Sequence, residues 1–216
     1  MLETFVEIVN EVLNFGFNDG PQVNRKRIES WVNEAQFQIA REVEASEFQE
    51  TEVITLVQGQ FKYPLPEDFL RVQDIYYPEL VARLKPLDLQ QYDMTAPAKF
   101  EGPPENYTLY GNELWVFPTP NNSTDTLELR YIKNAPALKA EGDVPLLDKN
   151  YLHLLVDYAL VRAYEAEDDN EMAQAHKNRW KEDLDAYASD KQWRNVDRPR
   201  ILEGSWTGSG YGGRVI

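Results

Sequence analysis

The two histidines have the widest range of possible chemistry in this chain. His153 and His176 lie far apart, and neither belongs to a His-Glu-x-x-His or Glu-x-x-His pattern. The sequence has no cysteine, which excludes disulfides, thiolate nucleophiles, Cys-ligated zinc and iron–sulfur clusters. We therefore expect both histidines to be helix-surface or packing residues, and we predict no metal and no cofactor.

Carboxylates are the second candidate group. With 37 Asp and Glu residues, two could meet in space for acid–base hydrolysis, but no pattern singles out a pair. The acidic run over 165–171 lacks the alternating acids around a central glycine of a calcium-binding loop, so we interpret it as a solvated helix face or cap. Nucleophile-elbow, phosphate-loop and dinucleotide-binding patterns are absent from the sequence. A carboxylate-based hydrolase remains the alternative function, without an identified catalytic residue.

Composition narrows the class of protein. The chain has 216 residues, 22 Lys and Arg against 37 Asp and Glu, and a formal charge of −15. With 42% hydrophobic and 12% aromatic residues, it can bury a core and is not wholly disordered. The acidic excess disfavours a duplex-binding surface, because nucleic-acid affinity comes mostly from Lys and Arg. The first residues lack the bases of a signal peptide, and no apolar run approaches the roughly 20 residues of a membrane span. We expect a cytoplasmic protein without membrane contact.

The elements that must position any site begin with a helical hairpin over residues 1–48. Apolar residues recur at helical spacing in two stretches, separated by the turn residues 18–21. The first stretch ends before Asn14. In the second, the inward stripe is Ile28, Trp31, Val32, Ala35, Ile39 and Val43.

Over residues 51–135 the spacing of the apolar residues changes from helical to alternating. We predict this part of the chain to be a small, mostly antiparallel β region. Residues 53–57 and 61–63 are expected to pair across a turn at Gly59. A second hairpin is predicted with its turn at Tyr110-Gly111-Asn112-Glu113, since Gly-Asn favours two-residue turns.

Residues 146–187 hold no strong helix breaker and are predicted to be helical. One bent helix and an αα-hairpin both fit this pattern. We favour a break near Asp168 or Asp169, because either residue can cap a new helix.

The last part of the chain, residues 188–216, is expected to be an extended docking tail. Its five bases and three acids give +2, which leaves −17 on residues 1–187, and five of the eleven glycines lie between 204 and 213. Large apolar side chains on such a segment are typical of anchors for a partner. The predicted interface residues are Trp193, Arg194, Arg198, Arg200, Trp206, Tyr211, Val215 and Ile216.

Several segments, in their order along the chain, resemble the pattern of the head-to-tail adaptor (connector) proteins of tailed bacteriophages. The resemblance covers roughly residues 20–190. It is carried by segments 28–35, 64–70, 107–120 (YTLYGNELWVFPTP), 127–131, 135–138, 143–147 and 151–160.

This resemblance implies a structural protein and not an enzyme. Its fold would be α+β: one adaptor domain over 1–187, in which a helical bundle carries the inserted β region, followed by the tail. The resemblance further implies a homo-oligomeric ring, usually a dodecamer, that binds beneath the portal protein in the neck of the virion. Such a ring extends the channel through which DNA is ejected, without binding it specifically, and offers a platform for tail or nozzle proteins. Assembly would take place in the host cytoplasm, and the tail would extend onto neighbouring subunits or the portal. Another neck or tail-tube protein is a further alternative.

Overall fold

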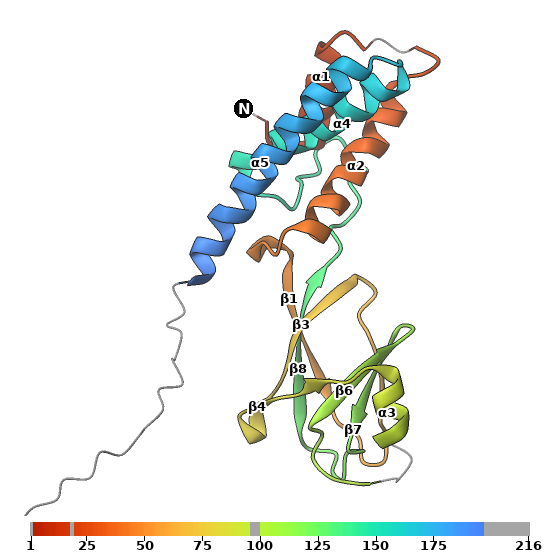
Figure 1. The fold of residues 1–216 in the computed structure, drawn as a ribbon, viewed down its shortest axis with the longest axis vertical. Coiled ribbons are helices and arrows are strands. Elements are labelled where there is room, and N and C mark those ends of the chain that lie inside the picture. The colour runs from red at the N-terminus through yellow and green to blue at the C-terminus, as the bar shows by residue number, and fades with distance from the viewer. Residues whose placement is uncertain (1, 18–19, 96–99, 197–216) are drawn as a thin grey trace, which may run out of the picture.

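The computed structural model describes residues 2–17, 20–95 and 100–196; the side chains of residue 95 and of residues 192–196 lie outside that description. The molecule is elongated, with a helical bundle at one end and a β region at the other (Figure 1). This arrangement confirms the predicted α+β class, in which the β region is inserted between the second helix and the later helices.

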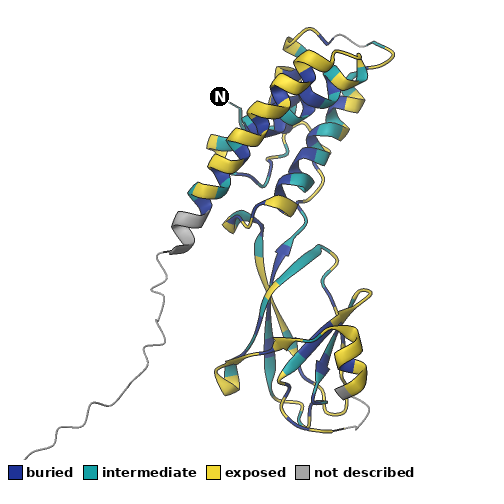
Figure 2. Ribbon diagram, viewed as in Figure 1, coloured by how far each residue is buried: buried dark blue, intermediate teal, exposed yellow. Residues whose placement is uncertain are grey.

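Four helices form the bundle. They are α1 (Phe5–Asn14), α2 (Arg25–Glu42), α4 (His153–Ala166) and α5 (Asn170–Val196). Helix α4 is the centre, because it contacts each of the other three. Buried residues lie on the faces that these helices share (Figure 2). The expected stripe on α2 is confirmed in that Ile28, Val32, Ala35 and Ile39 are fully buried, because they recur every three or four residues on one face.

Local capping explains where the helices begin and end. Asn24 precedes α2 and its side chain accepts a hydrogen bond from the Arg27 amide at 3.1 Å, which satisfies one free donor of the first turn. Between α4 and α5, Asp168 has a positive φ of 58° and Asp169 Oδ1 accepts from the Met172 amide at 3.1 Å. The αα-hairpin with a break at these residues is therefore confirmed.

The boundary expected at residue 188 is wrong. Helix α5 continues through it to Val196, because Leu184 and Tyr187 are buried and Lys191 is only 2% exposed. Their spacing of three and four residues keeps one face of the helix on the bundle. The helical part of the chain therefore includes residues 188–196, and residues 197–216 lie outside the described residues.

The β region contains two four-stranded sheets. The first has the order β1-β8-β3-β4, and its strands are β1 (Gln49–Thr55), β8 (Thr126–Lys133), β3 (Phe69–Tyr77) and β4 (Ala82–Arg83). The second has the order β2-β7-β6-β5, and its strands are β2 (Lys62–Pro64), β7 (Glu113–Phe117), β6 (Asn106–Tyr110) and β5 (Lys85–Pro86). All pairs are antiparallel except β5 with β6. The short elements are α3 (Leu89–Thr95), η1 (Ser46–Phe48), η2 (Pro78–Leu80) and η4 (Lys149–Tyr151).

The hairpin expected between 53–57 and 61–63 is wrong. Strand β1 pairs with β8, and β2 pairs with β7 in the other sheet. The chain crosses between the sheets here, so that Leu56 and Tyr63 are buried in the core that the sheets share. The Tyr63 hydroxyl holds the crossing by donating to the Gln60 carbonyl at 2.9 Å and accepting from the Val57 amide at 3.1 Å. Burial of these two side chains outweighs a local pairing.

The predicted hairpin at residues 110–113 is confirmed by the pairing of β6 with β7. Its Gly111 has a φ of 61°, and a Cβ at this position would meet nothing within 4 Å.

Replacing Gly111 by valine is therefore expected to lower the free energy of unfolding by about 1–2 kcal/mol, through backbone strain alone. Urea unfolding measures this change. Gly111→Asn is the control, since asparagine tolerates the left-handed region; an equal loss in both variants would contradict the explanation.

Candidate functional site

The predicted interface residues lie at or beyond the end of α5. Trp193 and Arg194 belong to the last turns of that helix, and their side chains lie outside the description. The other six, Arg198, Arg200, Trp206, Tyr211, Val215 and Ile216, lie outside the described residues. Their role as an interface stays a prediction. The structure does show how the base of this segment is held.

The last turns of α5 extend past the beginning of α4 and pack against η4. Tyr187 is fully buried, and its ring centroid lies 4.7 Å from that of Tyr151 in η4. The position of α5 is thus set by an aromatic pair, whose preferred geometries add to the free energy of burial.

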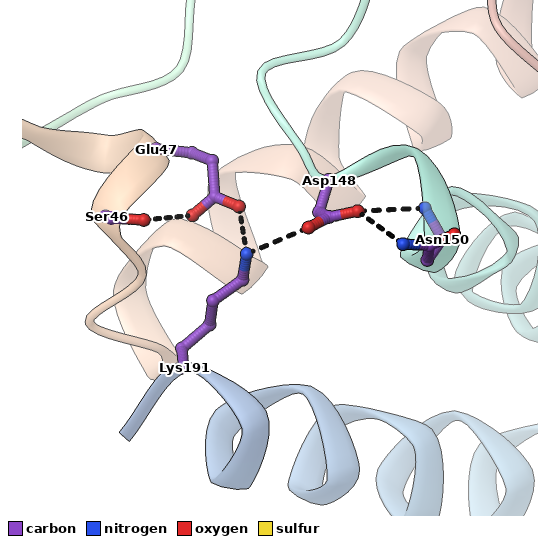
Figure 3. Close-up of polar contacts among 5 residues, drawn as sticks. All are labelled: Ser46, Glu47, Asp148, Asn150 and Lys191. Atoms are coloured by element: carbon purple, nitrogen blue, oxygen red, sulfur yellow. Dashed lines mark hydrogen bonds and ion pairs between the residues drawn. The ribbon is translucent and has the colours of Figure 1, made fainter. Parts of the chain in front are cut away.

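Lys191 is the next residue on this face of α5, and it joins three segments of the chain. Its ammonium donates hydrogen bonds to the carboxylate of Glu47 in η1 and to Asp148 Oδ2 at 3.1 Å (Figure 3). The other oxygen of Asp148 accepts from the amide and the side chain of Asn150 at 3.0 and 3.1 Å. Glu47 Oε2 accepts from the Ser46 hydroxyl at 3.1 Å. We refer to Lys191, Glu47 and Asp148 as the triad.

The triad is a favourable place for a buried ammonium. Burial alone would lower the pKa of Lys191, but the hydrogen bonds and charges of Glu47 and Asp148 outweigh it and raise that pKa. Both carboxylates are themselves largely covered, with side chains 22% and 17% exposed. Because η1 is the connection between α2 and β1, the triad fixes the exit of the C-terminal segment against the junction of the bundle and the β region.

The raised pKa of Lys191 gives a pH dependence whose sign is fixed. A basic group whose pKa is higher in the folded than in the unfolded state contributes its full stabilisation at pH values below the unfolded pKa of 10.5. This stabilisation is lost as the pH rises through the pKa of the folded state. The difference in unfolding free energy between the wild type and Lys191→Met should be constant from neutral pH to about 10 and should shrink above it. Urea unfolding at a series of pH values measures the difference. Lys181→Met, at an exposed position of α5, should show no such dependence, and a difference that stays constant to pH 11.5 would contradict the assignment.

Both histidines take part in contacts between α4 and α5, in agreement with the expectation of packing or surface roles. The buried His176 places Nδ1 3.2 Å from Asp157 Oδ1, and His153 Nε2 lies 3.4 Å from Asp183. Arg179 approaches Asp157 Oδ2 at 3.4 Å. These pairs hold the helices together. Within the described ranges, His, Asp and Glu side chains form no group of three that could hold a metal ion.

The hydrolase alternative gains no support from the carboxylates. In the part of the chain that the structure describes, four carboxylates have clearly displaced pKa values: Glu7, Glu50, Asp125 and Asp143. Hydrogen bonds lower all four. A general acid needs a raised pKa. A broad hollow of about 730 Å³ is lined by Glu44, Glu50, Asp74 and Arg130 among others, and Arg130 is paired with Asp74 at 3.6 Å.

The sequence interpretation missed Lys191, because this residue was counted among the bases of the tail. The signal that finds it is the helical spacing of Leu184, Tyr187 and Lys191, which continues the apolar face of α5. Its two acid partners are far away in sequence, at positions 47 and 148, so the triad itself had no local pattern.

The model of a known family, described as SU10 adaptor protein, matches residues 3–200. The chain belongs to this family. The match confirms the resemblance to phage head-to-tail adaptors, and it spans the bundle, the β region and all of α5. The SU10 adaptor family implies a structural role in the phage particle. Comparison with curated proteins gave no significant match. No helix of the described residues has the length and apolarity needed to cross a membrane.

Proposed function

We propose that this SU10-family adaptor assembles as a ring, with twelve copies expected, beneath the portal protein in the neck of the virion. The ring extends the DNA channel and carries tail or nozzle proteins. The observation that carries the proposal is the family match, which covers residues 3–200 and not a single motif. The triad supports it by giving the C-terminal segment a fixed origin, as a segment that docks on an adjacent subunit or on the portal requires.

The charge distribution supports the same proposal. Residues 1–187 carry −17 and the remainder +2, so neighbouring copies would present acidic surfaces to a basic segment. An acidic body also suits a conduit, because like charges suppress adhesion of DNA phosphates. In low salt, mutual repulsion of the bodies should hinder ring formation unless the portal acts as a template.

The first test is the molar mass of the purified protein by light scattering, with and without portal protein, at several salt concentrations. We expect a monomer that forms a ring with portal, and a ring that needs less portal as salt rises. A ring that forms without portal would support the adaptor role and show that assembly needs no template. A monomer that ignores portal at every salt concentration would overturn the proposal.

The second test separates the segment from the body. A chain that ends at Val196 keeps α5 and the triad, so loss of portal or ring association would assign the docking role to residues 197–216. The double variant Trp206→Ala/Tyr211→Ala should lose most of the same association, since aromatic anchors dominate interface energies. Unchanged assembly of the chain ending at Val196 would contradict the docking role.

A further inference from the structure

Strand β1 leaves one edge of its sheet open. It stands at the end of the order β1-β8-β3-β4, and in the described part of the chain no strand pairs with its other side. The four residues 50–53 are all exposed, and Val53 is 61% exposed. A free edge of seven residues is a ready template for another strand.

The direction of the backbone groups along β1 follows from its register. The Leu56 amide donates to the Asp125 carbonyl at 2.9 Å, and β1 continues from there in unbroken antiparallel register with β8. Alternation then directs the amides and carbonyls of Ile54, Glu52 and Glu50 toward β8. Those of residues 51 and 53 point to the open edge. The Thr51 amide bonds to the neighbouring Glu50 carboxylate, whose pKa is lowered chiefly by Lys133 and also by this amide.

The side chains of β1 alternate between two faces. Glu50, Glu52 and Ile54 lie opposite the buried Tyr131, Leu129 and Leu127, so they share the inner face of the sheet. Thr51 and Val53 belong to the outer face. The open edge thus presents the order acid, polar, acid, apolar, apolar over residues 50–54.

We propose that residues 198–202 of the same molecule add to this edge as a strand parallel to β1. The segment reads Arg198-Pro199-Arg200-Ile201-Leu202. Set beside residues 50–54 in parallel, the arginines face Glu50 and Glu52, Ile201 faces Val53 and Leu202 faces Ile54. Opposite-charge and apolar pairs of this kind are the units that stabilise a sheet.

Backbone geometry selects the same register. In a pair of parallel strands, a residue whose amide and carbonyl point toward the other strand lies opposite a residue whose amide and carbonyl point away from the first strand. Arg198, Arg200 and Leu202 then turn their amides and carbonyls to the open edge, while Pro199 turns outward. Proline has no amide hydrogen, so it loses no ladder bond there and closes the new edge to further strands. A shift by one residue would direct Pro199 at β1 and place both arginines beside Thr51 and Val53.

The end of α5 lies close enough to β1 for residues 198–202 to reach the open edge. Lys191 is bonded to Glu47, three residues before Glu50. The helix from 191 to 196 and two extended residues span up to about 14 Å, whereas three residues from Glu47 to Glu50 span at most about 10 Å. In Figure 1, α5 runs obliquely down the bundle and ends level with the beginning of β1, which continues away from the bundle. A segment that continues in the same sense would lie parallel to β1. Because both strands belong to one molecule, the inference does not depend on the proposed ring. It assigns Arg198 and Arg200 to the edge of β1 and leaves Trp206, Tyr211, Val215 and Ile216 as the residues that would dock on a partner.

Hydrogen exchange of individual amides in the full-length monomer tests the pairing. The Thr51 and Val53 amides should exchange at least about tenfold faster in Arg198→Glu/Arg200→Glu than in the wild type, whereas the Glu52 and Ile54 amides, already bonded to β8, should not change. The matched control Arg194→Glu/Arg214→Glu makes the same change in charge outside the five positions and should behave as the wild type. Equal exchange at Thr51 and Val53 in the wild type and both variants would overturn the inference.

Cross-linking identifies the molecule that supplies the strand. The chain has no cysteine, so Glu52→Cys/Arg200→Cys introduces a single pair, which should oxidise within one chain and give a monomer of altered mobility. Thr51→Cys/Arg200→Cys, with side chains on opposite faces, is the control and should oxidise far more slowly. Disulfide-linked dimers as the main product would overturn the intramolecular pairing and assign the edge to a second copy.

Discussion

Lys191→Met will lower the free energy of unfolding by about 2–3 kcal/mol, because removal of the ammonium leaves Glu47 and Asp148 as two covered carboxylates without their shared counter-charge. Breaking a buried ion pair costs about 3–5 kcal/mol, and the partial exposure of both acids reduces this cost. Urea unfolding monitored by circular dichroism measures the change. On the proposed function, the variant should also bind portal more weakly at temperatures where it is folded, since the origin of the C-terminal segment is no longer fixed.

Lys191→Arg is the informative control. It keeps a cation that can bridge both carboxylates, so it should retain most of the stability and of the proposed portal association. Lys181→Met removes a lysine from an exposed position of the same helix and should change stability by less than about 0.5 kcal/mol. If Lys181→Met and Lys191→Met were equally stable, the triad would not be a structural element.

Gln36→Met will lower the free energy of unfolding by about 2–4 kcal/mol. Gln36 is fully buried in α2; its Nε2 donates to the Pro136 carbonyl at 2.9 Å and its Oε1 accepts from the Leu146 amide at 2.8 Å. Methionine fills the same volume but leaves both backbone groups unsatisfied, at about 1–3 kcal/mol each. Thermal or urea unfolding measures the loss, with Gln38→Met as the control in the same helix. Gln38 is only partly buried, and an effect as large as that of Gln36→Met would point to helix propensity instead.

The elements that could be predicted from sequence are those with a local signal. The stripe on α2, the turn at Gly111 and the break at Asp168 each depend on residues within a few positions of one another. The partner of β1 had no such signal, because β8 lies more than 70 positions later and the choice was decided by burial of Leu56 and Tyr63. Periodicity predicts that a strand exists, but not which strand it joins.

The candidate site also has one part that could be predicted from sequence and one part that could not. Composition indicated a basic, aromatic C-terminal segment, but not that α5 continues to Val196. This continuation depends on Lys191, whose partners Glu47 and Asp148 lie before and after the inserted β region in the sequence. A buried lysine that is stabilised by distant acids is indistinguishable in sequence from a solvated one.

The pairing of Gln49 with Ile132 places the first and last strands of the insertion side by side where they leave the bundle. An inserted segment whose two ends are neighbours can be exchanged for another of different size without moving the helices it interrupts. The bundle can therefore keep its packing while the β region changes in size or sequence. Recombination between related phages at positions near 48 and 134 would transfer the whole β region as one folded unit.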